Sequence, residues 1–252
     1  MSTISSSLDI YNSAYSKFTP DWIDESNIDQ LNSFISLKNS TLWDFFNQYI
    51  DQFNIRQDLD RMDFAEFGCG LGAISLELAI KNLSVSGFDI SELAIAMANE
   101  ISQLKNLNIN YKSLDLVKNS TKIKFDFIID SHLLHCITSA SDRLSYLENI
   151  YDSLNKGGIC IVETMVFNKD IQFPVGYEFD ATGVVHKLID GEFHPVRCLK
   201  SSIEIEKELK DSGFKIDYLY YHNELAFDLF NDYKDYPVSM LPKTLRIVVK
   251  KT

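Results

Sequence analysis

The spacing of hydrophobic residues along the chain changes near residue 62. Before this point the clearest pattern is a helical stripe in residues 41–53, where apolar side chains recur every three or four positions behind a Ser or Thr cap. After it, short apolar runs alternate with amphipathic stretches. The runs predict strands at 62–67, 83–90, 107–112, 124–130 and 157–164, and the stretches predict helices at 73–81, 92–105 and 141–154.

This alternation predicts the fold class. Successive β-α-β units cross over with a right hand and build a parallel sheet with helices on both faces. A helix at 201–213 and two strands at 214–222 and 245–250 follow, and their closeness in sequence predicts an antiparallel pair at one edge. We therefore expect an α/β, doubly wound, Rossmann-like sheet of seven strands, mostly parallel, with an antiparallel edge strand.

Residues 165–200 interrupt the alternation. They are rich in aromatic side chains and contain two prolines but no long periodicity, which is typical of a functional segment rather than a disordered one. We expect residues 1–60 to form an N-terminal helical cover, and residues 165–200 to form a substrate-side insert within a domain spanning 61–252. Candidate substrate-binding residues in these two segments are Tyr11, Tyr15, Phe173, Tyr177 and Arg197. An equally good interpretation is plain helix packing for the first segment and, for the insert, a β-arm that packs its aromatic side chains on the sheet edge.

The composition restricts the possible partners. The chain has 252 residues and a formal net charge of −12, and no basic stripe is visible, so we expect no nucleic-acid partner. Neither a bilayer-spanning apolar run nor a secretory signal is visible, which predicts a cytoplasmic protein without a membrane partner, as a monomer or homodimer. Four widely spaced cysteines favour buried thiols over a disulfide framework.

A glycine-rich turn joins the strand predicted at 62–67 to the helix predicted at 73–81. In "AEFGCGLG", Glu66 is followed by Gly68, Gly70 and Gly72. Such a turn lies at the carboxyl edge of the strands, where ligands bind in these sheets, and glycines let the backbone approach a ligand closely. A carboxylate beside the turn would repel a pyrophosphate, and no P-loop lysine is present. The pattern therefore favours a ligand that carries a positive charge.

With this turn the chain resembles the class I S-adenosylmethionine-dependent methyltransferases. Further motifs of that family follow in order in "SGFDIS", "YKSLDL", "FDFIIDSHLLHCI" and "LNKGGICIV", so that the resemblance covers about residues 62–164 and 201–251. It implies S-adenosylmethionine as the cofactor, with Asp89 on the ribose hydroxyls and Asp115 near the adenine; capping of the next helix is the alternative role for Asp89. The cofactor-binding residues it implies are Glu66, Gly68, Cys69, Gly70, Gly72, Asp89, Ile90, Asp115, Leu116 and Asp130.

The resemblance implies an in-line methyl transfer, and we expect a small-molecule acceptor. Residues 8–30 contain five acidic residues and a single lysine, and this excess of negative charge favours a neutral or cationic acceptor. His132 and His135 follow the fourth strand and are the candidate catalytic bases, with packing near the cofactor as the alternative. Their spacing matches no standard metal signature, so we expect no metal. The alternative functions are methylation of a protein substrate and non-catalytic, regulatory binding of S-adenosylmethionine.

Overall fold

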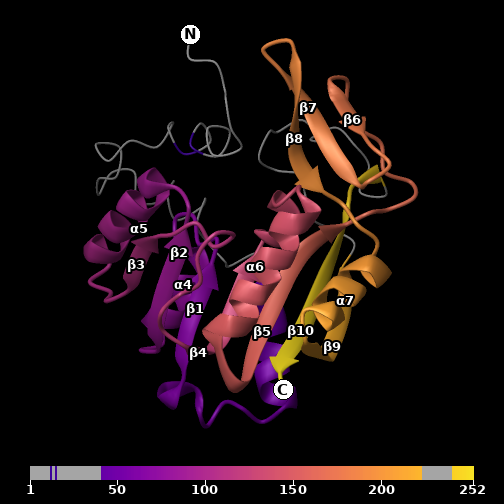
Figure 1. Ribbon diagram of the computed structural model, residues 1–252. Coiled ribbons are helices and arrows are strands. Elements are labelled where there is room, and N and C mark those ends of the chain that lie inside the picture. Colours follow the sequence, from indigo (N-terminus) through magenta and orange to yellow (C-terminus); the bar gives the residue numbers. More distant parts are fainter. Residues whose placement is uncertain (1–11, 13–14, 16–40, 223–239) are drawn as a thin grey trace.

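A seven-stranded sheet runs through the centre of the molecule (Figure 1), in a computed structural model that describes residues 12, 15, 41–222 and 240–252. The strand order is β3-β2-β1-β4-β5-β10-β9. The strands are β1 (Asp63–Phe67), β2 (Ser84–Asp89), β3 (Asn110–Ser113), β4 (Phe125–Ser131), β5 (Leu154–Val166), β9 (Phe214–His222) and β10 (Lys243–Lys251). β1 to β5 pair in parallel, and β10 is antiparallel to both β5 and β9. The predicted mostly parallel sheet with an antiparallel edge pair is confirmed.

Helices cover both faces of the sheet (Figure 1). On one face, α3 (Thr41–Gln52), α4 (Ala73–Ile80) and α5 (Glu92–Leu104) enclose one hydrophobic cluster; on the other, α6 (Ala140–Ser153) and α7 (Ser202–Asp211) enclose a second. Neighbouring strand residues alternate between them: Phe64 lies in the first cluster and Ala65 in the second. None of the helices in the described ranges is long and apolar enough to cross a membrane.

The helix predicted at 41–53 is present as α3, and its apolar stripe packs on the sheet. Phe46 contacts the rings of Phe64 and Phe127 edge-on, with centroid distances of 6.4 and 5.5 Å. Tyr49 is buried and donates a hydrogen bond to Asp217 on β9 at 2.8 Å. This part of the predicted N-terminal cover therefore belongs to the core of the sheet domain.

Residues 165–200 contain more regular structure than their sequence predicts. They form a separate antiparallel sheet of β6 (Tyr177–Phe179), β7 (Val184–Ile189) and β8 (Glu192–Cys198), which projects beyond the carboxyl end of β5 (Figure 1). The turn between β7 and β8 is Asp190-Gly191, and both residues have positive φ, 51° and 89°. An Asp-Gly pair between apolar runs is a strong hairpin signal, and it could have predicted these two strands.

Candidate active site

The carboxyl ends of four adjacent parallel strands bring the predicted site residues to one edge of the sheet. Glu66 lies near the end of β1, Asp89 ends β2, Asp115 follows β3, and Asp130 lies near the end of β4. Because parallel strands end on the same side, residues up to 64 positions apart in the sequence, 66 and 130, meet at one edge.

The glycine turn is fixed to the end of β2 by backbone hydrogen bonds. The amides of Gly68 and Cys69 both donate to the carbonyl of Phe88, at 2.8 and 2.9 Å. Gly68, Gly70 and Gly72 have φ of 72°, 50° and 83°, in the left-handed region that favours glycine. Cys69 is buried, so the turn offers its backbone, and not this thiol, to a ligand.

Tyr111 on β3 supports the turn from beneath, and sequence reasoning missed it. A Cβ atom on Gly72 would lie 1.9 Å from the Tyr111 hydroxyl, and one on Gly87 would lie 2.4 Å from the ring. Both glycines therefore make room for one buried aromatic side chain. The isolated Gly87 inside a predicted strand was the available signal, since such a glycine often marks a close approach.

Asp89 organises the turn as well as facing the site. Its Oδ2 accepts a hydrogen bond from the amide of Gly70 and its Oδ1 accepts one from the amide of Ser91, both at 2.9 Å. Burial raises the pKa of Asp89, and the hydrogen bonds from Ser91 and Gly70 oppose that rise. The Ser91 hydroxyl caps α5 by accepting from the amide of Ala94. Asp89 therefore holds both the turn and the start of α5, so the capping role also has a geometric basis.

Asp115 is half-buried and paired with the only cation among the residues that line the adjoining cavity. The Nζ of Lys118 lies 2.8 Å from its Oδ2, and the amide of Val117 donates to its Oδ1 at 3.0 Å. Partial burial alone would raise the pKa of this carboxyl, but the Lys118 ion pair and the backbone hydrogen bonds outweigh it and lower the pKa. Asp115 is therefore ionised and held in one orientation.

A cavity of about 370 Å³ joins these residues. The carboxylates of Asp89, Asp115 and Asp142 line it together with hydrophobic side chains that follow β3 and β4. It is lined by Gly68, Asp89, Ile90, Leu114, Asp115, Leu116, Val117, Lys118, Leu133, Cys136, Ile137, Thr138, Asp142 and Tyr146. Five of the predicted cofactor-binding residues are in this set; Leu133, Cys136, Ile137 and Thr138 also line it and were not among the predicted cofactor-binding residues.

The lining fits the nucleoside part of S-adenosylmethionine. A ribose diol needs hydrogen-bond acceptors, which Asp89 supplies, and an uncharged adenine suits the apolar wall around Leu116 and Ile137. Among the described lining residues Lys118 is the only cation, and it is already paired with Asp115, so none of these residues is free to select a phosphate. The donor set therefore matches a ligand without phosphate groups.

Glu66 is buried beneath the turn, where it also caps α4. Its Oε2 accepts hydrogen bonds from the amide and the hydroxyl of Ser75, at 2.8 and 2.6 Å. Burial raises its pKa to about 7, against opposing hydrogen bonds from Ser75 and Ile74. A nearby positive charge would favour the ionised form of this carboxyl. The direct contact of Glu66 with a cofactor stays a prediction.

Replacing Glu66 with glutamine should change how stability depends on pH. The native carboxyl, with a pKa of about 7, keeps a proton that the unfolded chain, with a pKa near 4.5, has already lost, so stability falls as pH rises between these values. The slope from this one group is at most about 1.4 kcal/mol per pH unit. Glu66→Gln keeps an acceptor for Ser75 but cannot titrate. Urea unfolding of both proteins from pH 5 to 8 should give curves that diverge; parallel curves would contradict the assignment.

Asp130 is fully buried and serves the loop after β4. It accepts hydrogen bonds from the amides of Leu133 and Leu134, at 2.7 and 3.1 Å, and from the Tyr146 hydroxyl at 2.9 Å. Burial raises its pKa to about 6, while the hydrogen bonds from Leu133 and Tyr146 oppose the rise. These contacts give Asp130 a positioning role under the cavity wall; its direct contact with a cofactor stays a prediction.

The two candidate histidines have different environments. His135 is buried, and its Nδ1 accepts from the amide of Met165 at 3.2 Å; burial, with the charge of Arg197 nearby, lowers its pKa. The side chain of His132 is 44% exposed, and its Nε2 lies 2.6 Å from Oε1 of Glu163. Of the two, His132 alone has a ring that a substrate could reach.

Asn12 and Tyr15 are the two described residues in the first forty, and both lie against the site. A Cβ on Gly70 would lie 2.7 Å from the hydroxyl of Tyr15, and the Ser91 hydroxyl bonds to Oδ1 of Asn12 at 2.7 Å. Tyr15 therefore overlies the glycine turn as a cover would. Tyr11 lies outside the described residues.

The predicted substrate-binding residues of the insert are only partly accessible. Arg197 is 2% exposed and its Nη1 donates to the carbonyl of Val196 at 2.6 Å. Tyr177 is half-buried, and Lys187 lies over its ring at 5.2 Å. The Phe173 ring stacks on Phe179 at 5.4 Å. Packing accounts for these contacts, and substrate binding by the three predicted residues stays a prediction.

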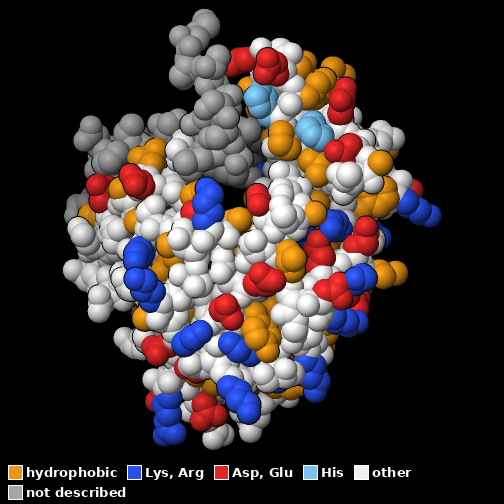
Figure 2. All heavy atoms as spheres, viewed as in Figure 1, with side chains coloured by type: hydrophobic (Ala, Val, Ile, Leu, Met, Phe, Trp, Pro, Cys, Tyr) orange, Lys and Arg blue, Asp and Glu red, His pale blue; other side chains and the backbone are white. Residues whose placement is uncertain are grey.

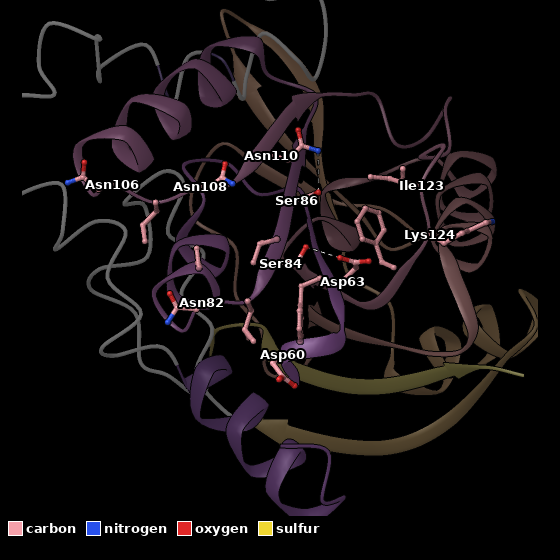
Figure 3. A pocket seen from close by; sticks show the side chains of 16 residues that line it. Asp60, Asp63, Asn82, Ser84, Ser86, Asn106, Asn108, Asn110, Ile123 and Lys124 are labelled. Atoms are coloured by element: carbon pink, nitrogen blue, oxygen red, sulfur yellow. Dashed lines mark hydrogen bonds between the residues drawn. The ribbon is translucent and has the colours of Figure 1, made fainter. Parts of the chain in front are cut away.

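A second cavity, of about 900 Å³, lies at the opposite end of the strands (Figure 3). Polar side chains from the amino ends of β1, β2 and β3 line it, several of them asparagines. Some already bond to each other, as Ser84 does to Asp63 at 2.7 Å and Asn110 to Ser86 at 3.4 Å. This cavity shares no residue with the one at the carboxyl edge.

Comparisons with known proteins agree with this geometry. The family described as a methyltransferase domain matches residues 65–160. The probable S-adenosyl-L-methionine-dependent methyltransferase TehB of Haemophilus influenzae is 27% identical over 114 residues, which are 45% of this chain and 40% of TehB. A putative protein N5-glutamine methyltransferase of Methanocaldococcus jannaschii is 31% identical over 166 residues, 64% of this chain and 74% of that protein. The solved structure of a Pyrococcus horikoshii protein covers 94% of this chain and 98% of its own, with a TM-score of 0.62 at 16% identity.

Proposed function

Because this chain belongs to the class I S-adenosylmethionine-dependent methyltransferases, we propose that it methylates a small neutral or cationic molecule. The bound cofactor supplies a sulfonium methyl group, which an acceptor lone pair takes while the electrons of the broken S–C bond stay on sulfur. Most of the rate acceleration can come from alignment of the reactants and exclusion of water, worth up to about 7–11 kcal/mol in well-oriented systems.

The observation that carries the proposal is the cavity at the carboxyl edge of the sheet. Asp89 and Asp115 lie in it beside the glycine turn, and Lys118, its one cation, is paired with Asp115. Asp89 would hold the ribose of the cofactor, and the turn at Gly68 to Gly72 would receive its methionine end. The site thus has the acids that a cationic, phosphate-free cofactor needs.

The charge around the site supports a neutral or cationic acceptor. The Glu163 carboxylate lies beside His132. Burial would raise the pKa of Glu163, but the interactions with His132 and Arg246 outweigh burial and lower this pKa. Arg197, the candidate for binding an acceptor carboxylate, is buried. On the face drawn in Figure 2, Lys and Arg side chains gather mostly over the lower half, away from the end where the parallel strands of Figure 1 terminate. Among the described side chains of that face, few positive charges would therefore meet an anionic acceptor.

Matched pairs of metabolites test the acceptor class. After calorimetry with S-adenosylmethionine, release of S-adenosylhomocysteine is measured with acceptors that differ only in a phosphate or a carboxylate. We expect turnover of the neutral or amine member and little of its anionic partner. Turnover confined to the anionic members would contradict the proposal.

Two further arms of the same assay separate the alternatives. A glutamine-containing peptide is included because one relative is named as a protein N5-glutamine methyltransferase. Turnover with the peptide alone would replace the small molecule by a protein acceptor. Tight binding of S-adenosylmethionine without product release from any acceptor would favour a regulatory binding protein.

A further inference from the structure

Three side chains form a hydrogen-bonded chain that ends at the exposed ring of His132, the residue after β4; the other two are Glu163 on β5 and Arg246 on β10. His132 Nε2 lies 2.6 Å from Oε1 of Glu163, and Nε of Arg246 donates to Oε2 of Glu163 at 2.5 Å. Glu163 on β5 and Arg246 on β10 are 3% and 2% exposed and stand opposite each other in the strand register. One carboxylate therefore orients the histidine, and one guanidinium orients the carboxylate.

The pairing determines which nitrogen of His132 is free to act. Glu163 is ionised, because its pKa is lowered, and an ionised carboxylate only accepts hydrogen bonds. The hydrogen of a neutral His132 must then reside on Nε2, which leaves a lone pair on Nδ1. Among the described residues, none hydrogen-bonds to Nδ1.

The backbone holds His132 in an uncommon conformation. Its φ is 77°, in the left-handed region that non-glycine residues seldom occupy. The His132 amide donates to the Glu163 carbonyl at 3.1 Å, and the Cys136 thiol donates to the His132 carbonyl at 2.9 Å. The surrounding structure thus fixes a strained residue with an exposed ring. The next residue in the chain, Leu133, packs closely against Gly68 of the glycine turn.

We propose that His132 is the catalytic base of this enzyme, through Nδ1, and that Glu163 and Arg246 are its positioning residues. This rests on the proposed methyl transfer. A base is needed only if the acceptor is a hydroxyl or an amine that must lose a proton, so the acceptor class becomes narrower. The O–H or N–H bond breaks, its electron pair stays on the acceptor atom, and the proton moves to Nδ1. The resulting imidazolium is stabilised by the Glu163 carboxylate.

The charged groups around His132 determine the expected pH dependence. Glu163 on β5 favours the protonated ring, and Asp130 on β4 adds to this when ionised; His135 is buried and neutral, and Arg246 acts on the ring through Glu163. A base must be unprotonated to act, so kcat should rise with pH as His132 loses its proton. Removing the Glu163 charge takes away the group that stabilises the imidazolium, so Glu163→Gln should lower kcat and change its pH profile.

Nitrogen-15 NMR of the histidine rings tests the arrangement without an acceptor. In the wild-type full chain, neutral His132 should carry its hydrogen on Nε2. Glu163→Gln should change the tautomer ratio of neutral His132, whereas Glu208→Gln should leave it unchanged. Glu208 is a matched control, because it also pairs with two basic side chains, Arg143 at 2.6 Å and Lys200 at 2.5 Å, but from α7. A neutral ring with hydrogen on Nδ1, or a tautomer ratio unaffected by Glu163→Gln, would overturn the proposal.

Steady-state kinetics with an acceptor identified in the metabolite screen gives the second test. His132→Asn suits the left-handed backbone, which asparagine tolerates, and should lower kcat about 10²- to 10⁴-fold. The Kd for S-adenosylmethionine should hardly change, because His132 does not line the cofactor cavity. If His132→Asn keeps the wild-type kcat and pH profile, the base is refuted while methyl transfer stands. If the wild type binds the cofactor but releases no product from any acceptor, the proposed function fails and the base with it.

Discussion

Replacing Gly72 with alanine is expected to lower the free energy of unfolding by about 2–5 kcal/mol. A left-handed alanine costs about 1–2 kcal/mol, and forced overpacking adds about 1–3 kcal/mol. Gly72 has φ of 83°, and its new Cβ would meet the Tyr111 hydroxyl at 1.9 Å and ring carbon Cζ at 2.7 Å. Denaturant unfolding measures the loss, and calorimetry should find weaker binding of S-adenosylmethionine, because a displaced turn no longer presents its backbone amides.

Gly157→Ala is the matched control for Gly72→Ala. Gly157 has a similar φ of 75°, but an added Cβ would meet nothing within 4 Å, so this variant pays only the conformational cost. Adding Tyr111→Phe to Gly72→Ala removes the closest contact and should restore part of the stability. Equal losses for the two alanine variants would show that Tyr111 does not constrain the turn.

Asp89→Ala is expected to weaken S-adenosylmethionine binding about 5- to 150-fold. Ribose hydroxyls that lose their acceptor cost about 1–3 kcal/mol, and each 1.4 kcal/mol is about tenfold in affinity. The variant also removes the acceptor for the amides of Gly70 and Ser91, so the turn itself loses support. Calorimetry on the folded variant measures the change in Kd.

Asp63→Ala provides the comparison at the other end of the sheet. Asp63 is also a strand carboxylate and accepts from the Ser84 hydroxyl at 2.7 Å, but it lines the second cavity. Its removal should leave the Kd for S-adenosylmethionine unchanged. An unchanged Kd in Asp89→Ala would remove Asp89 from the cofactor site.

The main sheet could be predicted because its elements carry local signals. Buried strands such as β4 read as short apolar runs, and amphipathic helices such as α5 fill the space between them, so the order of elements implies the parallel topology. The individual strands of the small β6-β7-β8 sheet were not predicted, because they are short and half-exposed and their burial does not alternate regularly. Only the Asp190-Gly191 turn marked it.

Site residues could be predicted from the sequence where a characteristic residue type follows a strand. They could not be predicted where a contact joins strands that are far apart in the sequence. The resemblance gave Asp89 and Asp115, and both line the cavity. Nothing in the sequence links Glu163 to Arg246, 83 residues apart, because their pairing depends on β10 lying beside β5. Burial, which sequence does not report for single residues, separates His132 from His135.

Different strands of the sheet carry the predicted cofactor-binding acids and the proposed base, and this separation affects how such an enzyme can diverge. The strand ends of β1, β2 and β3 carry Glu66, Asp89 and Asp115, whereas β4, β5 and β10 carry His132, Glu163 and Arg246. If His132 is the base proposed above, substitutions around it could change which acceptor is deprotonated, while the acids at the ends of β1, β2 and β3 stay as they are. Selection or engineering could therefore exchange one acceptor chemistry for another while the affinity for the methyl donor is inherited unchanged.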